Sequence, residues 1–76
     1  MPSRIELLAL NILQEELTEH KHTALKEDEL INKLVKITKE EKGTLLEALE
    51  NSEIVITRVT SKGQRMCAAL KEYTLE

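Results

Sequence analysis

Phenylalanine and tryptophan are absent from this sequence, and tyrosine occurs only once among its 76 residues. The hydrophobic core must therefore be built from leucine, isoleucine, valine and alanine. A chain of this length forms one domain at most, and such a domain buries only roughly 60% of the surface that its unfolded chain exposes. We therefore expect a single domain over residues 1–76, with a small core and modest stability.

Cysteine, glycine and long apolar segments are scarce as well. Cys67 is the only cysteine, which excludes an internal disulfide and fits a reducing compartment. The two glycines stand apart and form no glycine-rich phosphate-binding loop. No apolar segment approaches the roughly 20 residues that cross a bilayer, and no signal peptide is visible. We expect a cytoplasmic protein that has no membrane partner.

Charged residues are abundant and unevenly placed. They make up 33% of the chain, with a net charge of −3. Residues 1–53 contain seven basic and twelve acidic residues, whereas residues 54–76 contain four basic and two acidic ones. No acidic residue lies between Ile54 and Lys71. The C-terminal part is therefore locally basic, while the part before it is acidic.

The N-terminal half predicts two helices. Ser3 and Glu6 have the spacing of a capping box, which predicts a first helix over residues 4–19. A short edge strand fits residues 23–25. A second helix is predicted over residues 27–37, because acidic residues fill its first turn and lysines its last turn, as the helix dipole favours. On the first helix, Leu7 and Leu10 widen the apolar stripe and suggest a second packing partner.

The C-terminal half predicts a third helix followed by a hairpin. Thr38 and Glu41 form a second candidate capping box, and apolar residues recur at helical spacing, which predicts a helix over residues 39–51. The residues 54–59 are mostly β-branched and predict a strand. A turn at 60–63, in which Gly63 can adopt positive φ, returns the chain along 64–70.

These elements predict an α+β, mostly helical fold, a winged helix-turn-helix with three helices and a C-terminal β-hairpin. Its core should centre on the apolar residues that share the inward faces. They are Leu8, Ile12, Leu30, Leu34, Leu45, Leu49, Ile54 and Ile56.

Gly43 falls inside the third predicted helix, where glycine costs roughly 1 kcal/mol relative to alanine. It is either a tolerated surface residue or a point of close approach for a partner backbone. We favour the surface residue.

Residues that could carry chemistry are few. His20 and His22 would share a face if they lay on a strand, but a metal site needs a third ligand. Cys67 lies in an apolar segment that predicts a buried strand, so we interpret it as a core residue. The carboxylates have helical spacing and indicate solvated faces. We therefore expect no catalytic residue, cofactor or metal in this chain.

Nucleic-acid binding is the function that this fold suggests. A helix-turn-helix usually places its second helix in the major groove. Here that helix offers Lys39 and Lys42, but four glutamates give it a net charge of −2, which opposes phosphate contact. The hairpin, with Arg58, Lys62 and Arg65, is the better candidate. Alternatively, these cations only keep an exposed sheet edge soluble.

The chain resembles the small helix-turn-helix domain that precedes the motor in RecD-like ATP-dependent DNA helicases, the family of the exodeoxyribonuclease V alpha subunit. The resemblance covers residues 5–76. The segments that carry it are Leu25-Lys26-Glu27-Asp28-Glu29-Leu30, Thr38-Lys39-Glu40-Glu41, Leu45-Leu46-Glu47-Ala48-Leu49-Glu50, Ile54-Val55 and the ending Met66-Cys67-Ala68-Ala69-Leu70-Lys71-Glu72-Tyr73-Thr74-Leu75-Glu76. Where Ser52 and Glu53 stand, many members of the family have a glycine-containing turn.

The resemblance implies a monomeric, non-catalytic accessory domain, with DNA or a neighbouring motor domain as its partner. The ATP-binding loop, the metal-binding acid and the motor arginines of the family have no match in this sequence. Two alternatives remain open. A free-standing winged-helix transcription regulator would dimerise and prefer a DNA sequence, whereas a protein-interaction domain would not bind DNA.

Overall fold

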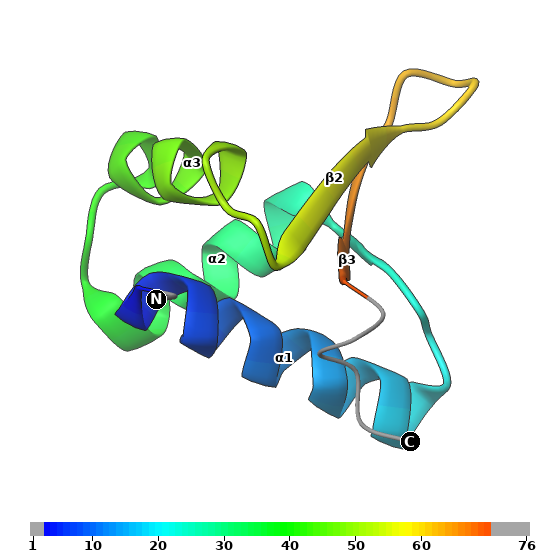
Figure 1. Cartoon of the computed structure of the whole chain (residues 1–76), viewed down its shortest axis with the longest axis horizontal. Helices are drawn as coiled ribbons and strands as arrows, with labels where there is room; N and C mark the ends of the chain where they lie inside the picture. Colours follow the sequence, from blue (N-terminus) through cyan, green and yellow to red (C-terminus); the bar gives the residue numbers. More distant parts are fainter. Residues whose placement is uncertain (1–2, 71–76) are drawn as a thin grey trace.

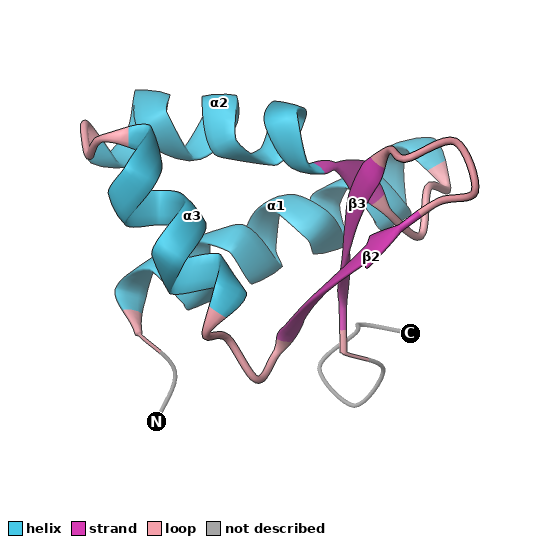
Figure 2. Cartoon of the chain, turned by 90° about the horizontal axis from the view of Figure 1, so that it is seen from above, coloured by secondary structure: helices cyan, strands magenta, loops and turns pink. Residues whose placement is uncertain are grey.

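The computed structural model describes residues 3–70, and this part of the chain contains three helices and a three-stranded antiparallel sheet (Figure 1). The elements follow in the order α1 (Arg4–His20), β1 (Leu25–Lys26), α2 (Glu27–Thr38), α3 (Lys42–Glu50), β2 (Val55–Val59) and β3 (Arg65–Ala69). The prediction of a mostly helical α+β chain with a C-terminal hairpin is confirmed. The hairpin tip and α3 lie on opposite sides of the molecule (Figure 2).

The first capping box is confirmed. The backbone N–H of Glu6 donates to Ser3 Oγ at 3.2 Å, and the N–H of Ser3 donates to Glu6 Oε1 at 3.1 Å. These two bonds satisfy donors that a helix start would otherwise leave unpaired. Helix α1 ends at His20, and the next residue, Lys21, adopts the left-handed conformation at φ 60°.

The second predicted capping box is wrong. Thr38 is the last residue of α2, where its Oγ1 donates to the carbonyl of Leu34 at 2.8 Å, and Lys39 then adopts the left-handed conformation at φ 63°. The same Oγ1 accepts the N–H of Glu40 at 3.1 Å, so the hydroxyl stabilises the end of α2 and the turn after it rather than the start of α3. Helix α3 therefore begins three residues later than predicted, at Lys42, and its N-cap Glu41 makes no side-chain capping bond.

The sheet has the strand order β1-β3-β2, so β3 is central and β2 is an edge strand. The short strand predicted at 23–25 lies instead at Leu25–Lys26, where Leu25 pairs with Cys67. The hairpin is confirmed, with strands slightly shorter than predicted. Pairing with β1 protects one side of β3, which leaves β2 as the exposed long edge of the sheet.

The core lies between the three helices and one face of the sheet. Its buried members are Ala9, Leu10, Leu13, Leu25, Leu30, Ile31, Leu34, Leu45, Leu49, Ile54, Val55 and Cys67. Five of the eight predicted core residues are among them. Leu30, Leu34, Leu45, Leu49 and Ile54 are each at most 3% exposed.

The remaining three predicted core residues, Leu8, Ile12 and Ile56, are only half-buried. On α1, the stripe that faces the core is rotated toward Ala9 and Leu13, which are 0% and 5% exposed. Leu10 is also buried, which corrects the expectation that it faces a second partner, whereas Leu7 is 48% exposed.

On β2, side chains alternate between the two faces, and Val55 rather than Ile56 takes the core side. Where successive residues are all apolar or β-branched, the sequence does not reveal which of the two alternating sets of side chains faces the core.

Gly43 lies in the first turn of α3, with no heavy atom within 4 Å of the position that a Cβ would occupy. We predict that Gly43→Ala stabilises the protein by up to about 1 kcal/mol, because alanine loses less backbone entropy in a helix. Gly63→Ala is the matched control. It should destabilise, because Gly63 has a φ of 82°. Urea denaturation of both variants measures the effect, and a destabilising Gly43→Ala would contradict the open surroundings of this residue.

Candidate nucleic-acid interface

The β2–β3 hairpin positions three of the five predicted nucleic-acid-binding residues. Its turn is closed by the N–H of Thr60 donating to the carbonyl of Gln64 at 2.8 Å, and by the N–H of Gly63 donating to the carbonyl of Thr60 at 2.9 Å. Lys62 lies in this turn, while Arg58 and Arg65 lie on the two strands. The hairpin extends beyond the helices (Figure 1), so its tip is free to approach a large partner.

The strand register separates the two arginines. Arg58 pairs with Met66, and Val59 pairs with Arg65. Directly paired side chains share a face, and successive side chains along a strand alternate between faces. Arg65 is therefore on the same face as Cys67, toward the helices, whereas Arg58 is on the opposite, outer face. The three hairpin cations do not form one cluster.

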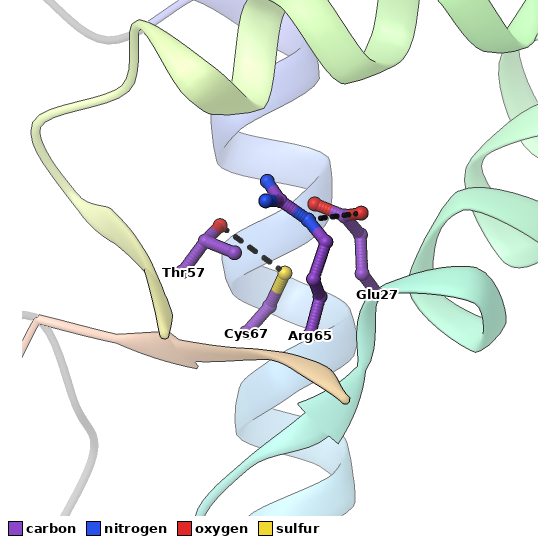
Figure 3. Close-up of polar contacts among 4 residues, drawn as sticks. All are labelled: Glu27, Thr57, Arg65 and Cys67. Carbon is purple, nitrogen blue, oxygen red and sulfur yellow. Dashed lines mark hydrogen bonds and ion pairs between the residues drawn. The ribbon is translucent and has the colours of Figure 1, made fainter. Parts of the chain in front are cut away.

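Arg65 is already paired within the protein. Its Nε donates to Oε1 of Glu27, the first residue of α2, at 2.9 Å (Figure 3). Glu27 is only 8% exposed, and it is the one buried charged residue in the described part of the chain. The hydrogen bond and the charge of Glu27 raise the pKa of Arg65. The hairpin has no acid nearby in sequence, but the fold brings one to it, so Arg65 is less available to phosphate than predicted.

Arg58 and Lys62 remain available. Both residues are exposed, and neither is among the hydrogen bonds and ion pairs that join the described residues. Lys26 was missed by the sequence reasoning. It pairs with Met66 across β1 and β3, so Lys26, Met66 and Arg58 form one row across the outer face of the sheet. Only the long-range pairing of β1 with β3 reveals this row.

Lys39 and Lys42 lie far from the hairpin tip. Lys39 follows α2 in the turn before α3, and Lys42 is the first residue of α3. Figures 1 and 2 both show this turn on the opposite side of the molecule from the hairpin tip. The later part of α3 carries Glu47 and Glu50 with no further basic residue. The two groups of predicted residues are therefore separate surfaces, and α3 itself remains unfavourable for phosphate.

Cys67 is fully buried, as predicted. Its Sγ lies 3.5 Å from Thr57 Oγ1 (Figure 3), and burial raises the pKa of the thiol. A raised pKa keeps the thiol protonated at neutral pH, and the thiolate is the nucleophilic form. Cys67 therefore serves as a small core residue on the inner face of β3.

The two histidines lie at the C-terminal end of α1 and just beyond it. His22 Nδ1 is 3.0 Å from Glu16 Oε1, a contact that lowers the pKa of Glu16, and the His20 and His22 rings stack at 6.0 Å. Among residues 3–70, no group of three histidine, cysteine or acidic side chains is arranged to hold a metal ion.

No protein family, curated protein or solved structure matches this chain. Within the described ranges, no helix has the length and apolar character required to cross a membrane.

Proposed function

We propose that this chain is a winged-helix module in which β2 and β3 form the wing and α2 and α3 form the helix-turn-helix. The element order and the β1-β3-β2 sheet support this interpretation. The turn of only three residues between Thr38 and Lys42 also supports it, because it joins two helices directly.

We further propose that the module is a non-catalytic accessory domain of a RecD-like DNA helicase, making weak contact with DNA independently of sequence. The observation that carries this proposal is the pair of unpartnered cations on the hairpin, Arg58 and Lys62. The acidic α3 and the internal pairing of Arg65 make recognition by helix insertion unfavourable. The helicase assignment rests on the sequence resemblance alone.

The contact would be electrostatic. Lysine and arginine side chains bind phosphate oxygens and release counterions from DNA, which requires no contact with base edges. The logarithm of the binding constant falls linearly with the logarithm of the salt concentration, and each phosphate neutralised makes this slope more negative by about 0.9. Arg58 and Lys62 together would give a slope of about −1.8, with Lys26 of the outer row as the nearest additional contributor. Such a module would bind weakly by itself and assist a motor that holds the DNA.

We predict that replacing Arg58 and Lys62 together with alanine abolishes binding to a short duplex of random sequence at low salt. Fluorescence anisotropy with a labelled duplex measures the effect. The matched control is the double variant of Lys39 and Lys42 to alanine, which removes the same charge from the opposite side of the molecule. It should bind nearly as the parent does.

Arg65→Ala tests whether the third hairpin cation contributes to DNA binding. This variant loses the contact with Glu27 but should retain DNA binding, because Arg65 is already paired within the protein. Equal binding by the parent and the hairpin variant would show that Arg58 and Lys62 only keep the sheet edge soluble. If the parent binds no DNA even at low salt, the accessory role in DNA contact is wrong.

A protein-interaction role is the second candidate, and exposed apolar side chains on all three helices favour it. Leu7 on α1, Ile37 on α2 and Leu46 on α3 are 48%, 49% and 39% exposed. Exposed apolar side chains are common singly, but they mark interfaces where they adjoin one another. Absence of DNA binding by the parent, with retained association with a motor domain, would favour this role.

A further inference from the structure

The outer edge of β2 presents unpaired backbone groups. Within the hairpin, the N–H of Leu70 donates to the carbonyl of Ile54 at 2.8 Å, and the N–H of Thr60 donates to the carbonyl of Gln64 at 2.8 Å. In an antiparallel pair, hydrogen-bonded positions alternate with positions whose N–H and C=O groups point away from the partner strand. The backbone N–H and C=O groups of even-numbered residues in β2 therefore bond β3. Those of odd-numbered residues point away from β3, toward the open edge of the sheet.

The residues whose backbone groups face the open edge are Val55, Thr57 and Val59. The N–H of Val55 is already occupied, because it donates to Ser52 Oγ at 3.1 Å. The N–H and C=O of Thr57 and the N–H of Val59 have no partner among the hydrogen bonds of the described residues. Their spacing of two residues matches the groups that another extended chain presents.

The two faces beside this edge differ in chemistry. On the inner face, a groove of about 320 Å³ lies between β2 and the end of α3, and its lining includes the apolar side chains of Leu49, Val55 and Val59 and the polar or charged side chains of Glu50, Ser52 and Arg65. Val59 is 60% exposed, the largest exposure of any large apolar side chain in the described part of the chain. On the outer face, Arg58 is the last member of the row that begins with Lys26, and it borders the free edge.

We propose that the edge of β2 binds an extended segment of a partner protein in which apolar and acidic residues alternate. The segment adds a fourth strand to the sheet. Its backbone bonds Thr57 and Val59, its apolar side chains lie over Val59 and the groove, and an acidic side chain on the outer face pairs with Arg58. The backbone bonds supply affinity, and the alternation supplies specificity.

Charge favours this occupant over a second copy of the chain. Two hairpin cations, Arg58 and Lys62, have no partner among the described side chains, whereas Arg65 is paired with Glu27. Pairing two copies of β2 would bring two such hairpins together, and like charges across neighbouring strands are destabilising. An acidic segment instead neutralises Arg58, whose guanidinium has no partner among the described side chains.

The probe is a capped synthetic peptide of nine residues that alternates valine and glutamate. We expect it to shift the amide resonances of Thr57 and Val59 in ¹⁵N-edited spectra and to slow hydrogen exchange at these two amides. The control is the same peptide N-methylated on every backbone amide. It keeps the side chains and the charge but has no N–H to donate to an edge strand, and it should cause no such change.

Two variants of the protein test the contacts separately. Val59→Pro removes the outward donor on an edge strand, where proline is tolerated, and should weaken peptide binding at least about tenfold. Val59→Ala retains the N–H donor and should weaken peptide binding less than Val59→Pro does. Arg58→Glu should reject the glutamate peptide and bind a peptide with lysine in place of glutamate.

Val59→Pro leaves the charge of the hairpin unchanged, so it should retain DNA binding. Failure of this proposal is therefore distinguishable from failure of the proposed function. Equal binding of the N-methylated peptide, or shifts confined to residues away from β2, would overturn the proposal. Protection of Thr57 and Val59 without peptide, together with a doubled mass in sedimentation, would assign the edge to a second copy and overturn it as well.

Discussion

Leu34→Ala is expected to lower the free energy of unfolding by about 2–5 kcal/mol, because it removes a fully buried side chain and leaves a cavity. Leu34 is 0% exposed and lies on α2, which contacts both α1 and α3. The stability of a small domain is itself only about 5–15 kcal/mol, so the variant should be largely unfolded at moderate urea concentrations. Urea denaturation followed by circular dichroism measures the loss.

Leu46→Ala is the matched control for this variant. It makes the same chemical change on α3, but at a side chain that is 39% exposed. Its effect should be less than about 1 kcal/mol, because a partly exposed side chain leaves no closed cavity. If both variants lose the same stability, Leu34 does not occupy the closed core in which the structure places it.

Ser52→Ala is expected to lower the free energy of unfolding by about 1–3 kcal/mol, because it leaves buried donors without a partner. Ser52 Oγ donates to Glu6 Oε2 at 2.7 Å and accepts the N–H groups of Ile54 and Val55 at 3.2 and 3.1 Å. One hydroxyl therefore fixes the start of the sheet to the first turn of α1. Thermal and urea denaturation at neutral pH measure the loss, and Ser61→Ala in the exposed hairpin turn is the control.

The effect of Ser52→Ala should also depend on pH. The hydrogen bond from Ser52 is the largest cause that lowers the pKa of Glu6, followed by the bond from the backbone of Ser3. A lowered pKa in the folded state gives stability that is present above the pKa of the unfolded chain and lost as pH falls through the folded value. The difference between parent and variant should therefore shrink in acid, below the usual glutamate pKa of about 4.3. A difference that grows in acid would contradict the Ser52–Glu6 bond.

The sequence predicts elements well where the signal is local. The Ser3–Glu6 capping box, the acidic first turn of α2 and the turn at Gly63 all act within a few residues, and the structure has each of them. Thr38 was misassigned for the same local reason, because a threonine between two helices can end the first or begin the second. Neighbouring residues alone do not decide between these roles.

The candidate site was predictable only in part, because its arrangement depends on pairing between distant segments. Arg58 and Lys62 can be selected from the charge pattern, and both are exposed. The pairing of Arg65 with Glu27 joins residues 38 apart in sequence, and no local pattern predicts it. Lys26 joins the outer row only through β1, a strand of two residues that carries almost no signal of its own.

The bond between Ser52 and Glu6 joins residues 46 apart in sequence, and this separation has a kinetic consequence. Closing a long loop loses chain entropy before any contact can compensate for it. The contacts between α2 and α3 are local and form without such a closure, so we expect the Ser52–Glu6 bond to form late in folding. Interactions that are absent from the transition state act on the unfolding rate. We therefore expect loss of this single hydroxyl to shorten the lifetime of the folded molecule more than it slows folding.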